Sequence, residues 1–273
     1  MDISRRLLLG GVAGLAAMPR LLAADSGKPA SAEAQAHDEM TSIEGMKMVG
    51  DETIAMLLYP GFTALDLVGP QYMFASLMGA KVLLVAKTLE PVTSDTGIAI
   101  VPTATFATCP ADLTVVFVPG GGPGTVRAMG NAETVAFVAD RGGRAKYVTS
   151  VCTGSLVLGK AGLLHGKRAT SHWAAREVLA DLGARPVAER VVADGNVITG
   201  AGVTAGLDFA LSLVATLRGR AYAEALALQA EYAPAPPFQT GTPETSRPEI
   251  LAPMKAMFSP LVEQMRSAAK PQP

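Results

Sequence analysis

From residue 53 onward, short runs of apolar residues alternate with longer stretches in which apolar residues recur at helical spacing. Runs of the first kind lie at 53–59, 81–86, 113–118 and 147–151. They have the length of strands and leave no polar face for solvent, which is typical of strands buried on both faces of a sheet. Their alternation with helices predicts an α/β fold, in which helices sandwich a mostly parallel sheet.

The same pattern predicts the smaller elements. Val92 to Val101 is expected to form a hairpin around Ser94-Asp95-Thr96-Gly97, and two short strands are expected to flank Asp194-Gly195. Helices are expected at 64–77, 132–141, 154–161, 171–182, 203–217 and 221–230.

The beginning of the chain has the features of an export signal. Ser4-Arg5-Arg6 is followed by an uncharged apolar run from Leu7 to Met18. That run is shorter than the roughly 20 residues of a membrane span, and it has the length of a signal-peptide core. We therefore predict a twin-arginine signal peptide over 1–24, a periplasmic location and no stable membrane anchor.

Three further segments follow the predicted signal. Residues 25–50 are rich in Ala, Ser, Glu and Gly, and are predicted to be a flexible linker. Residues 51–232 carry the alternation of strands and helices, and are predicted to be the catalytic domain. The Pro-rich tail over 233–273 is expected to wrap the surface or an oligomer partner rather than add a layer.

Composition narrows the class of ligand. The chain has 273 residues, of which 49% are hydrophobic and 17% charged, and its formal net charge is −1. This is a globular composition, and it gives no electrostatic reason to expect nucleic acid or an anionic membrane as a partner. A small neutral substrate fits the charge balance better.

Cys152 gives the clearest chemical signal. It lies between the apolar strand 147–151 and Thr153-Gly154-Ser155, at the turn from a buried strand into a helix. This layout is typical of a nucleophile elbow, where helix N–H groups and the helix dipole favour the thiolate. The alternative is a buried structural cysteine, and we predict that Cys152 is catalytic. Cys109, the other cysteine, lies in a turn and is expected to be structural and not bonded to Cys152.

Two more features are expected at the same edge of the sheet, because ligands bind at the carboxyl ends of parallel strands. Pro119-Gly120-Gly121-Gly122 follows a strand, and glycines there let backbone N–H groups approach a ligand; an ordinary strand-exit turn is the alternative. Asp66 lies among leucines after the first strand. It is either a simple charge at a helix start or a buried carboxyl with a raised pKa that shares a proton with Cys152.

The chain has three histidines, and only one is expected near this edge. His37 lies in the predicted linker and His165 in a polar turn, whereas His172 is expected to open a helix at the active edge. The absence of a His-x-Glu sequence disfavours a Cys-His-Glu triad. Since Cys and His do not cluster in the sequence, we predict no metal site.

Together these residues resemble the DJ-1/PfpI superfamily, which is similar to the class I glutamine amidotransferases, and within it the isonitrile hydratases. The elbow is specific to the superfamily as a whole. Two features match the smaller group of isonitrile hydratases: Thr153 in place of a histidine after the cysteine, and the tail Tyr232-Ala233-Pro234-Ala235-Pro236-Pro237-Phe238. The matching stretches are 65–70, 91–94, 118–121, 147–159, 168–173, 204–211 and 231–238.

The resemblance implies a flavodoxin-like fold, a homodimer and a reaction without a cofactor, in which an isonitrile and water give an N-substituted formamide. It implies that Cys152 is the nucleophile, that Asp66 shuttles the proton and that Thr153 contributes to the polar site. The intermediate would be a thioimidate on Cys152. Gly121, Gly122 and His172 are expected to contact the substrate.

Other functions on the same scaffold remain open. One is a ligand-sensing domain of an AraC-type regulator, although such regulators need a DNA-binding domain of about 100 residues downstream. Another is a glyoxalase-like, deglycase-like or protease-like hydrolase, and Thr153 in place of histidine disfavours a Cys-His protease. A redox or chaperone protein would show cysteine oxidation without turnover.

Overall fold

The computed structural model describes residues 32–270, so the predicted signal peptide over 1–24 lies outside the described residues. The chain divides into two compact units, 1–38 and 39–273, and the second contains the sheet. Helix α1 (Ala32–Thr41) lies inside the segment predicted as a linker, so that part of the segment is helical. None of the helices among the described residues is long and apolar enough to span a bilayer.

The central sheet has seven strands in the order β10-β11-β7-β6-β1-β2-β5. All neighbouring strands pair in parallel except β10 and β11, which form an antiparallel hairpin. The strands are β1 (Thr53–Leu57), β2 (Lys81–Ala86), β5 (Ala104–Thr105), β6 (Val115–Val118), β7 (Tyr147–Val151), β10 (Val191–Asp194) and β11 (Val197–Gly200). The predicted mostly parallel sheet is confirmed.

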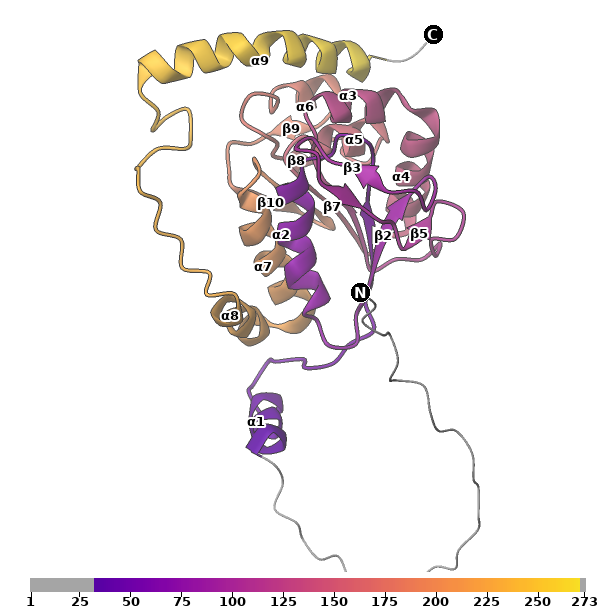
Figure 1. Cartoon of the computed structure of the whole chain (residues 1–273), viewed down its shortest axis with the longest axis vertical. Coiled ribbons are helices and arrows are strands. Elements are labelled where there is room, and N and C mark those ends of the chain that lie inside the picture. Colours follow the sequence, from indigo (N-terminus) through magenta and orange to yellow (C-terminus); the bar gives the residue numbers. More distant parts are fainter. Residues whose placement is uncertain (1–31, 271–273) are drawn as a thin grey trace, which may run out of the picture. The chain divides into compact units, whose positions relative to one another are not determined.

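Helices cover both faces of this sheet (Figure 1). On one face α2 (Ala64–Ala75), α7 (Ala205–Arg218) and α8 (Arg220–Gln229) pack together. On the other lie α3 (Pro123–Gly130), α4 (Ala132–Arg144), α5 (Gly154–Lys160) and α6 (Val178–Asp181). The flavodoxin-like sandwich expected from the sequence is therefore present.

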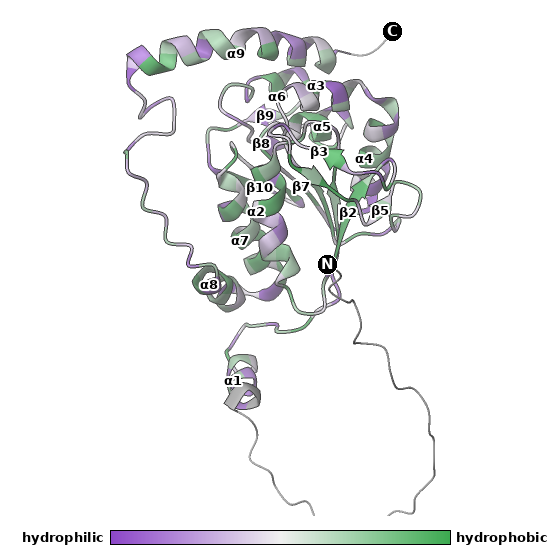
Figure 2. Cartoon of the chain, viewed as in Figure 1, coloured by the Kyte–Doolittle hydropathy of each residue, from purple (hydrophilic) through white to green (hydrophobic). Residues whose placement is uncertain are grey.

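The core is densest where the sheet meets α2 and α7. The rings of Phe74 on α2, Phe117 on β6 and Phe209 on α7 are buried and contact one another, with centroids 5.7 to 6.4 Å apart. Figure 2 shows the central strands as hydrophobic, as expected for strands covered on both faces. This packing fixes α2, which carries Asp66, against the sheet.

Among the smaller elements, the predicted hairpin and the two strands predicted around Asp194-Gly195 are confirmed, and one predicted helix is wrong. The hairpin forms from β3 (Val92–Thr93) and β4 (Ala99–Ile100), and another short pair, β8 (Arg168–Ala169) and β9 (Arg185–Pro186), lies outside the main sheet. The helix predicted over 171–182 is reduced to the four residues of α6. Before α6, the N–H of Ala174 donates to Nδ1 of His172 at 3.3 Å, a local bond that competes with helical pairing.

The C-terminal segment also differs from its prediction, because it adds a helix of 22 residues, α9 (Pro248–Ala269). This helix packs on α3 and α6 (Figure 1). Green and purple residues alternate along α9 in Figure 2, as expected for an amphipathic helix. The prolines at 253 and 260 are unfavourable inside a helix, so the sequence did not indicate one here. Apolar residues nevertheless recur at helical spacing, at Phe258, Leu261, Val262 and Met265.

Candidate active site

The site lies where four neighbouring parallel strands end at one edge of the sheet. β7 leads directly into Cys152, and β6 leads into the loop of Gly120, Gly121 and Gly122. β1 is followed by α2 with Asp66 in its first turn, and β11 is followed by the turn that contains Val203. Parallel pairing therefore brings together residues that are up to 137 positions apart, from Asp66 to Val203 (203 − 66 = 137).

Cys152 has the backbone conformation of a nucleophile elbow, with φ at 57°. A non-glycine residue in this region is strained by about 1–2 kcal/mol, so it persists only where its surroundings fix it. Its N–H donates to the carbonyls of Gly200 and Ala201, at 3.1 and 2.9 Å. Its carbonyl accepts from the hydroxyls of Ser155 and Ser171, at 3.2 and 3.0 Å. The predicted elbow is thus confirmed, and four hydrogen bonds fix its backbone.

Asp66 is fully buried beside the cysteine and interacts with its thiol. Its Oδ2 accepts the N–H of Gly120 at 2.9 Å, whereas Oδ1 has no partner of standard hydrogen-bond geometry among the described residues. Burial raises the pKa of Asp66 to about 7, against the bond from Gly120, which lowers it. Of the two interpretations open in the sequence, the structure supports a buried carboxyl with a raised pKa beside Cys152, rather than a simple charge at a helix start.

Gly120 allows this close approach because it has no side chain. A Cβ at this position would lie 2.7 Å from Oδ2 of Asp66 and 2.8 Å from Cβ of Cys152. Both contacts are too short for any residue with a side chain. The glycine is therefore a spatial requirement of the pair, whereas the sequence suggested it only as a ligand-facing backbone.

The surroundings of Cys152 oppose the predicted effect of the helix N–H groups on its thiol. Burial and the negative charge of Asp66 raise the pKa of the Cys152 thiol well above its usual range. The backbone N–H groups of Val203 and Thr153 act in the opposite direction but do not offset burial. Those N–H groups are placed to stabilise negative charge on the sulfur of Cys152.

Val203 is a site residue that the sequence did not indicate. Its φ of 20° is unusual for a β-branched residue, and this turn directs its N–H at the sulfur of Cys152. A strained backbone of this kind leaves no periodicity or motif in a sequence. Only the position of Val203 after β11, at the carboxyl edge of the sheet, could have suggested a role.

Thr153 belongs to a chain of hydrogen bonds that runs away from the pocket. Tyr59 donates its only hydroxyl proton to the carbonyl of Pro119 at 2.7 Å, so the bond of 3.2 Å between Tyr59 and Thr125 has Thr125 as donor. Thr153 must then donate to Thr125, at 2.7 Å, and it accepts the N–H of Gly121 at 3.1 Å. Thr153 and Gly121 therefore bond to each other, which fixes the glycine loop beside the elbow.

A pocket of 220 Å³ opens directly onto Cys152. The predicted residues Thr153, Gly121, Gly122 and His172 line it together with the cysteine. The outer wall, which the sequence did not predict, comes from α9 and consists of Phe258, Leu261, Val262 and Met265. The cysteine thus faces a small cavity with a mostly apolar wall, as a nucleophile for a compact ligand requires.

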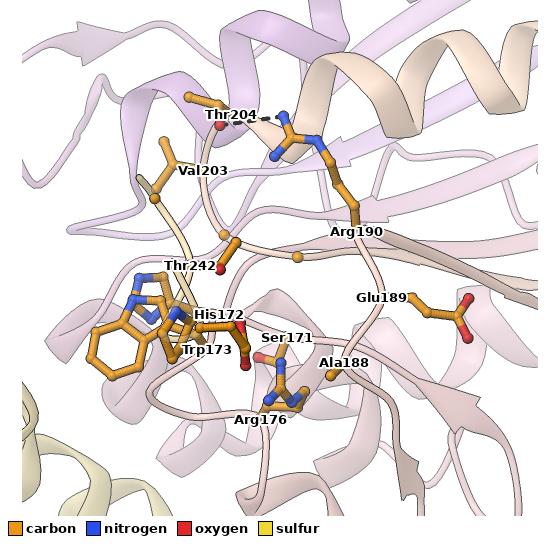
Figure 3. A pocket seen from close by; sticks show the side chains of 15 residues that line it. Ser171, His172, Trp173, Arg176, Ala188, Glu189, Arg190, Val203, Thr204 and Thr242 are labelled. Carbon is orange, nitrogen blue, oxygen red and sulfur yellow. Dashed lines mark hydrogen bonds between the residues drawn. The ribbon is translucent and has the colours of Figure 1, made fainter. Parts of the chain in front are cut away.

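His172 lies between this pocket and a neighbouring one of 300 Å³, which Figure 3 shows. Its ring contacts those of Trp173 and Phe258, each with centroids 5.5 Å away. Burial lowers the pKa of His172, so the imidazole is neutral at pH 7. His172 is in a turn rather than at a helix start, contrary to the prediction, but it does face the active edge.

Neither cysteine is in a disulfide, in agreement with the sequence. Cys109 is buried, and its carbonyl accepts a bond of 3.0 Å from Arg141. Over residues 32–270, no three His, Cys, Asp or Glu side chains lie close enough together to hold a metal ion.

A parallel sheet between helices, with a strained cysteine at a strand-to-helix turn, defines an α/β protein of the nucleophile-elbow class. The family model described as "DJ-1/PfpI family" matches residues 52–216, and the chain belongs to this family.

Three relatives illustrate the similarity in sequence and in structure. Isonitrile hydratase from Pseudomonas putida is 54% identical over 193 residues, which cover 71% of this chain and 84% of that protein. The crystal structure of a ThiJ/PfpI family protein from Pseudomonas syringae, 55% identical, superposes with a TM-score of 0.83 over 89% of this chain and 98% of the other. Drosophila melanogaster DJ-1beta, 23% identical, has a TM-score of 0.62 over 68% of this chain and all of its own, and shows the shared fold.

Proposed function

We propose that this protein is a lyase that adds water to an isonitrile and releases the N-substituted formamide. The observation that carries the proposal is the pairing of Cys152, on its strained elbow, with the buried carboxyl of Asp66 at the end of an apolar pocket. The 54% identity to an isonitrile hydratase supports the same substrate class. An isonitrile is neutral, and its divalent terminal carbon can take up both a sulfur nucleophile and a proton, which suits a small pocket with a thiol beside a carboxyl.

The first half-reaction forms a thioimidate. Asp66, ionised above its pKa of about 7, accepts the thiol proton as the sulfur of Cys152 attacks the terminal carbon of R–N≡C. The N–H groups of Thr153 and Val203 stabilise the negative charge that develops on sulfur. Asp66 then delivers the same proton to the carbon. The product is Cys152–S–CH=N–R, with one new C–S bond and one new C–H bond.

The second half-reaction is hydrolysis. Asp66, ionised again, accepts a proton from water as the oxygen attacks the thioimidate carbon. The C–S bond breaks, the thiol regains a proton and the nitrogen gains the other, so R–NH–CHO leaves. The sum is R–N≡C plus H₂O giving R–NH–CHO, and the enzyme returns to its starting state.

The test compares formamide release by three proteins incubated with cyclohexyl isonitrile. The wild type and Cys109→Ala are expected to release formamide, and Cys152→Ala is expected to lose at least 10³-fold in kcat, because the covalent step is gone. Cys109→Ala is the matched control, since it removes the chain's other buried cysteine away from the pocket. Equal formamide yield from Cys152→Ala and the wild type would refute the mechanism.

We also propose that the protein is a homodimer and that residues 1–24 direct it to the periplasm through the twin-arginine pathway. The paired Arg5 and Arg6 before an apolar run support export. Sedimentation of the purified protein tests the first proposal, and a monomer at micromolar concentration would contradict it. A chain without 1–24 that still reached the periplasm would contradict the second.

A further inference from the structure

The helix α9 presents one apolar stripe to the Cys152 pocket. Phe258, Leu261, Val262 and Met265 follow each other at spacings of three, one and three residues, which places them on a single helical face. Met265 is 1% exposed, whereas Met257, on the same helix, is 63% exposed. Met265 is therefore buried at the site, the other three stripe residues are half-buried there, and Met257 lies on the exposed face of α9.

Contacts at both ends of the stripe fix its position. Near its C-terminal end Arg266 forms an ion pair with Asp181 of α6 at 2.5 Å, and Nζ of Lys160 on α5 donates to the carbonyl of Lys270 at 2.5 Å. At the other end the Phe258 ring packs edge-on against Trp173, with centroids 5.6 Å apart. These contacts hold α9 over the pocket.

The lining of the pocket divides by chemistry. Cys152, Thr153 and Asp95 contribute polar groups to it. The Asp95 carboxylate already accepts the hydroxyl of Thr63 at 2.7 Å and the N–H of Ala64 at 3.3 Å. The helix α9 contributes only hydrocarbon, thioether and aromatic groups, so a charged group placed against it would be desolvated without a partner.

We propose that the α9 stripe is the specificity-determining wall of the site and that it selects isonitriles with a compact apolar group on nitrogen. The inference rests on the proposed function. A sulfur attack on the terminal carbon leaves the nitrogen substituent pointing away from Cys152, into the 220 Å³ pocket that the stripe lines together with the cysteine. This volume is below the 300–1,000 Å³ usual for drug-sized ligands, so bulky groups fit less well than compact ones.

Leu261 is the position at which to change the wall. It is only partly buried, so substitution there disturbs the core little, and its Cδ2 lies 3.7 Å from where a Cβ of Gly122 would be. Leu261→Ala enlarges the pocket and Leu261→Trp fills it. Met257→Ala is the matched control, because it truncates a solvent-exposed side chain on the same helix.

The experiment measures kcat/KM with methyl, n-butyl and cyclohexyl isonitrile. The expected result for Leu261→Ala is a rise of about 10-fold in the cyclohexyl-to-methyl ratio, and for Leu261→Trp a fall of similar size with methyl isonitrile still accepted. Met257→Ala keeps the ratio of the wild type. Unchanged ratios in both Leu261 variants would overturn the proposal, and a poorly folded variant cannot produce shifts of opposite sign.

A second readout separates this proposal from the hydratase activity. Alkylation of Cys152 by N-methylmaleimide and N-cyclohexylmaleimide, followed by mass spectrometry of its peptide, reports access to the sulfur without any turnover. Leu261→Ala is expected to raise the cyclohexyl-to-methyl labelling ratio and Leu261→Trp to lower it. If no isonitrile is hydrated but these labelling shifts appear, the proposed function is refuted, whereas the role of the α9 stripe in controlling access to Cys152 is supported. If isonitriles are hydrated but neither the kcat/KM ratio nor the labelling ratio changes, only the proposal about the α9 stripe is refuted.

Discussion

At the scale of single residues, the chemistry depends on one proton between Asp66 and Cys152. Burial raises the pKa of both groups, and the ionised carboxyl raises that of the thiol further. A carboxyl that is partly ionised near neutral pH can act as the base for the neighbouring thiol, as a base-assisted attack needs. A permanently ionised cysteine is not required.

The pH profile of kcat/KM is the first consequence. The ionised form of Asp66 is the base, so activity is expected to rise with pH, with a midpoint near the pKa of about 7. Asp66→Asn is expected to remove this rise and to lower kcat by 10² to 10⁴-fold. Steady-state assays between pH 5 and 9 measure both effects. A midpoint that persists in Asp66→Asn would assign the titration to another group.

The same carboxyl destabilises the fold at neutral pH. Because its pKa is raised from 3.8 to about 7, the folded state binds more protons than the unfolded state between these values, so stability falls as pH rises through this window. Asp66→Asn is neutral at every pH and is expected to be more stable than the wild type at pH 8, by about 3–4 kcal/mol. The gain is expected to vanish near pH 4, as urea unfolding at both pH values would show.

Some of these residues were predictable from the sequence and others were not. Cys152 directly follows a strand and Asp66 lies at the start of the helix after the first strand, so the order of elements along the chain places both at the active edge. Val203 acts through its backbone N–H, and Thr125 acts through its buried hydroxyl. Neither role leaves a recognisable pattern in the neighbouring sequence. The balance between the helix dipole and burial at Cys152 also needed the structure, because burial depends on every surrounding element.

At the scale of elements, the hydroxyl chain from Tyr59 through Thr125 to Thr153 couples β1 and α3 to the elbow. Thr125→Val keeps the shape but leaves Thr153 without its acceptor, which is expected to cost about 1–3 kcal/mol of stability. Misplacement of the glycine loop is expected to lower kcat by 10-fold or more with a smaller change in KM. Thr125→Ser restores the hydroxyl and should rescue kcat. Failure of this rescue would mean that Thr125 only fills space.

Helices and strands that are determined by their own sequence were predicted better than those that depend on contacts with other segments. The strands 81–86 and 147–151 match β2 and β7 at both ends, since continuous apolar runs bounded by polar turns fix them. The helix expected over 171–182 failed because Ser171 and His172 bond to Cys152 and to the backbone of Ala174 instead. The tail was misjudged from its prolines, although the stripe of α9 was present in the sequence.

At the scale of the whole molecule, a buried ion pair joins distant parts of the unit over 39–273. Arg218, at the end of α7, bonds through Nε to Glu52 at 2.8 Å and also donates to the carbonyls of Met48 and Met78, each at 2.9 Å. Although burial raises the pKa of Glu52, its bonds to Arg218 lower it below the usual value. The guanidinium thus links the segment before β1 and the residues just after α2 to the end of α7.

Removal of this cation alone is expected to be costly. Arg218→Met leaves the buried Glu52 carboxylate with only the more distant Lys47, whose Nζ lies 3.8 Å away, and is expected to destabilise the protein by about 3–5 kcal/mol. Combining it with Glu52→Gln removes the charge and should recover part of the loss. Urea unfolding of the two variants measures the difference, and a double variant less stable than Arg218→Met would contradict this account of the pair.

The central claim is that a covalent bond forms between the sulfur of Cys152 and the isonitrile carbon. The most direct measurement quenches the enzyme with acid during turnover of cyclohexyl isonitrile and determines the mass of the intact protein and of its Cys152 peptide. The account predicts an added mass equal to one isonitrile on that peptide, and none in Cys152→Ala. Formamide production by Cys152→Ala at the rate of the wild type, with the wild-type cysteine unmodified, would contradict it.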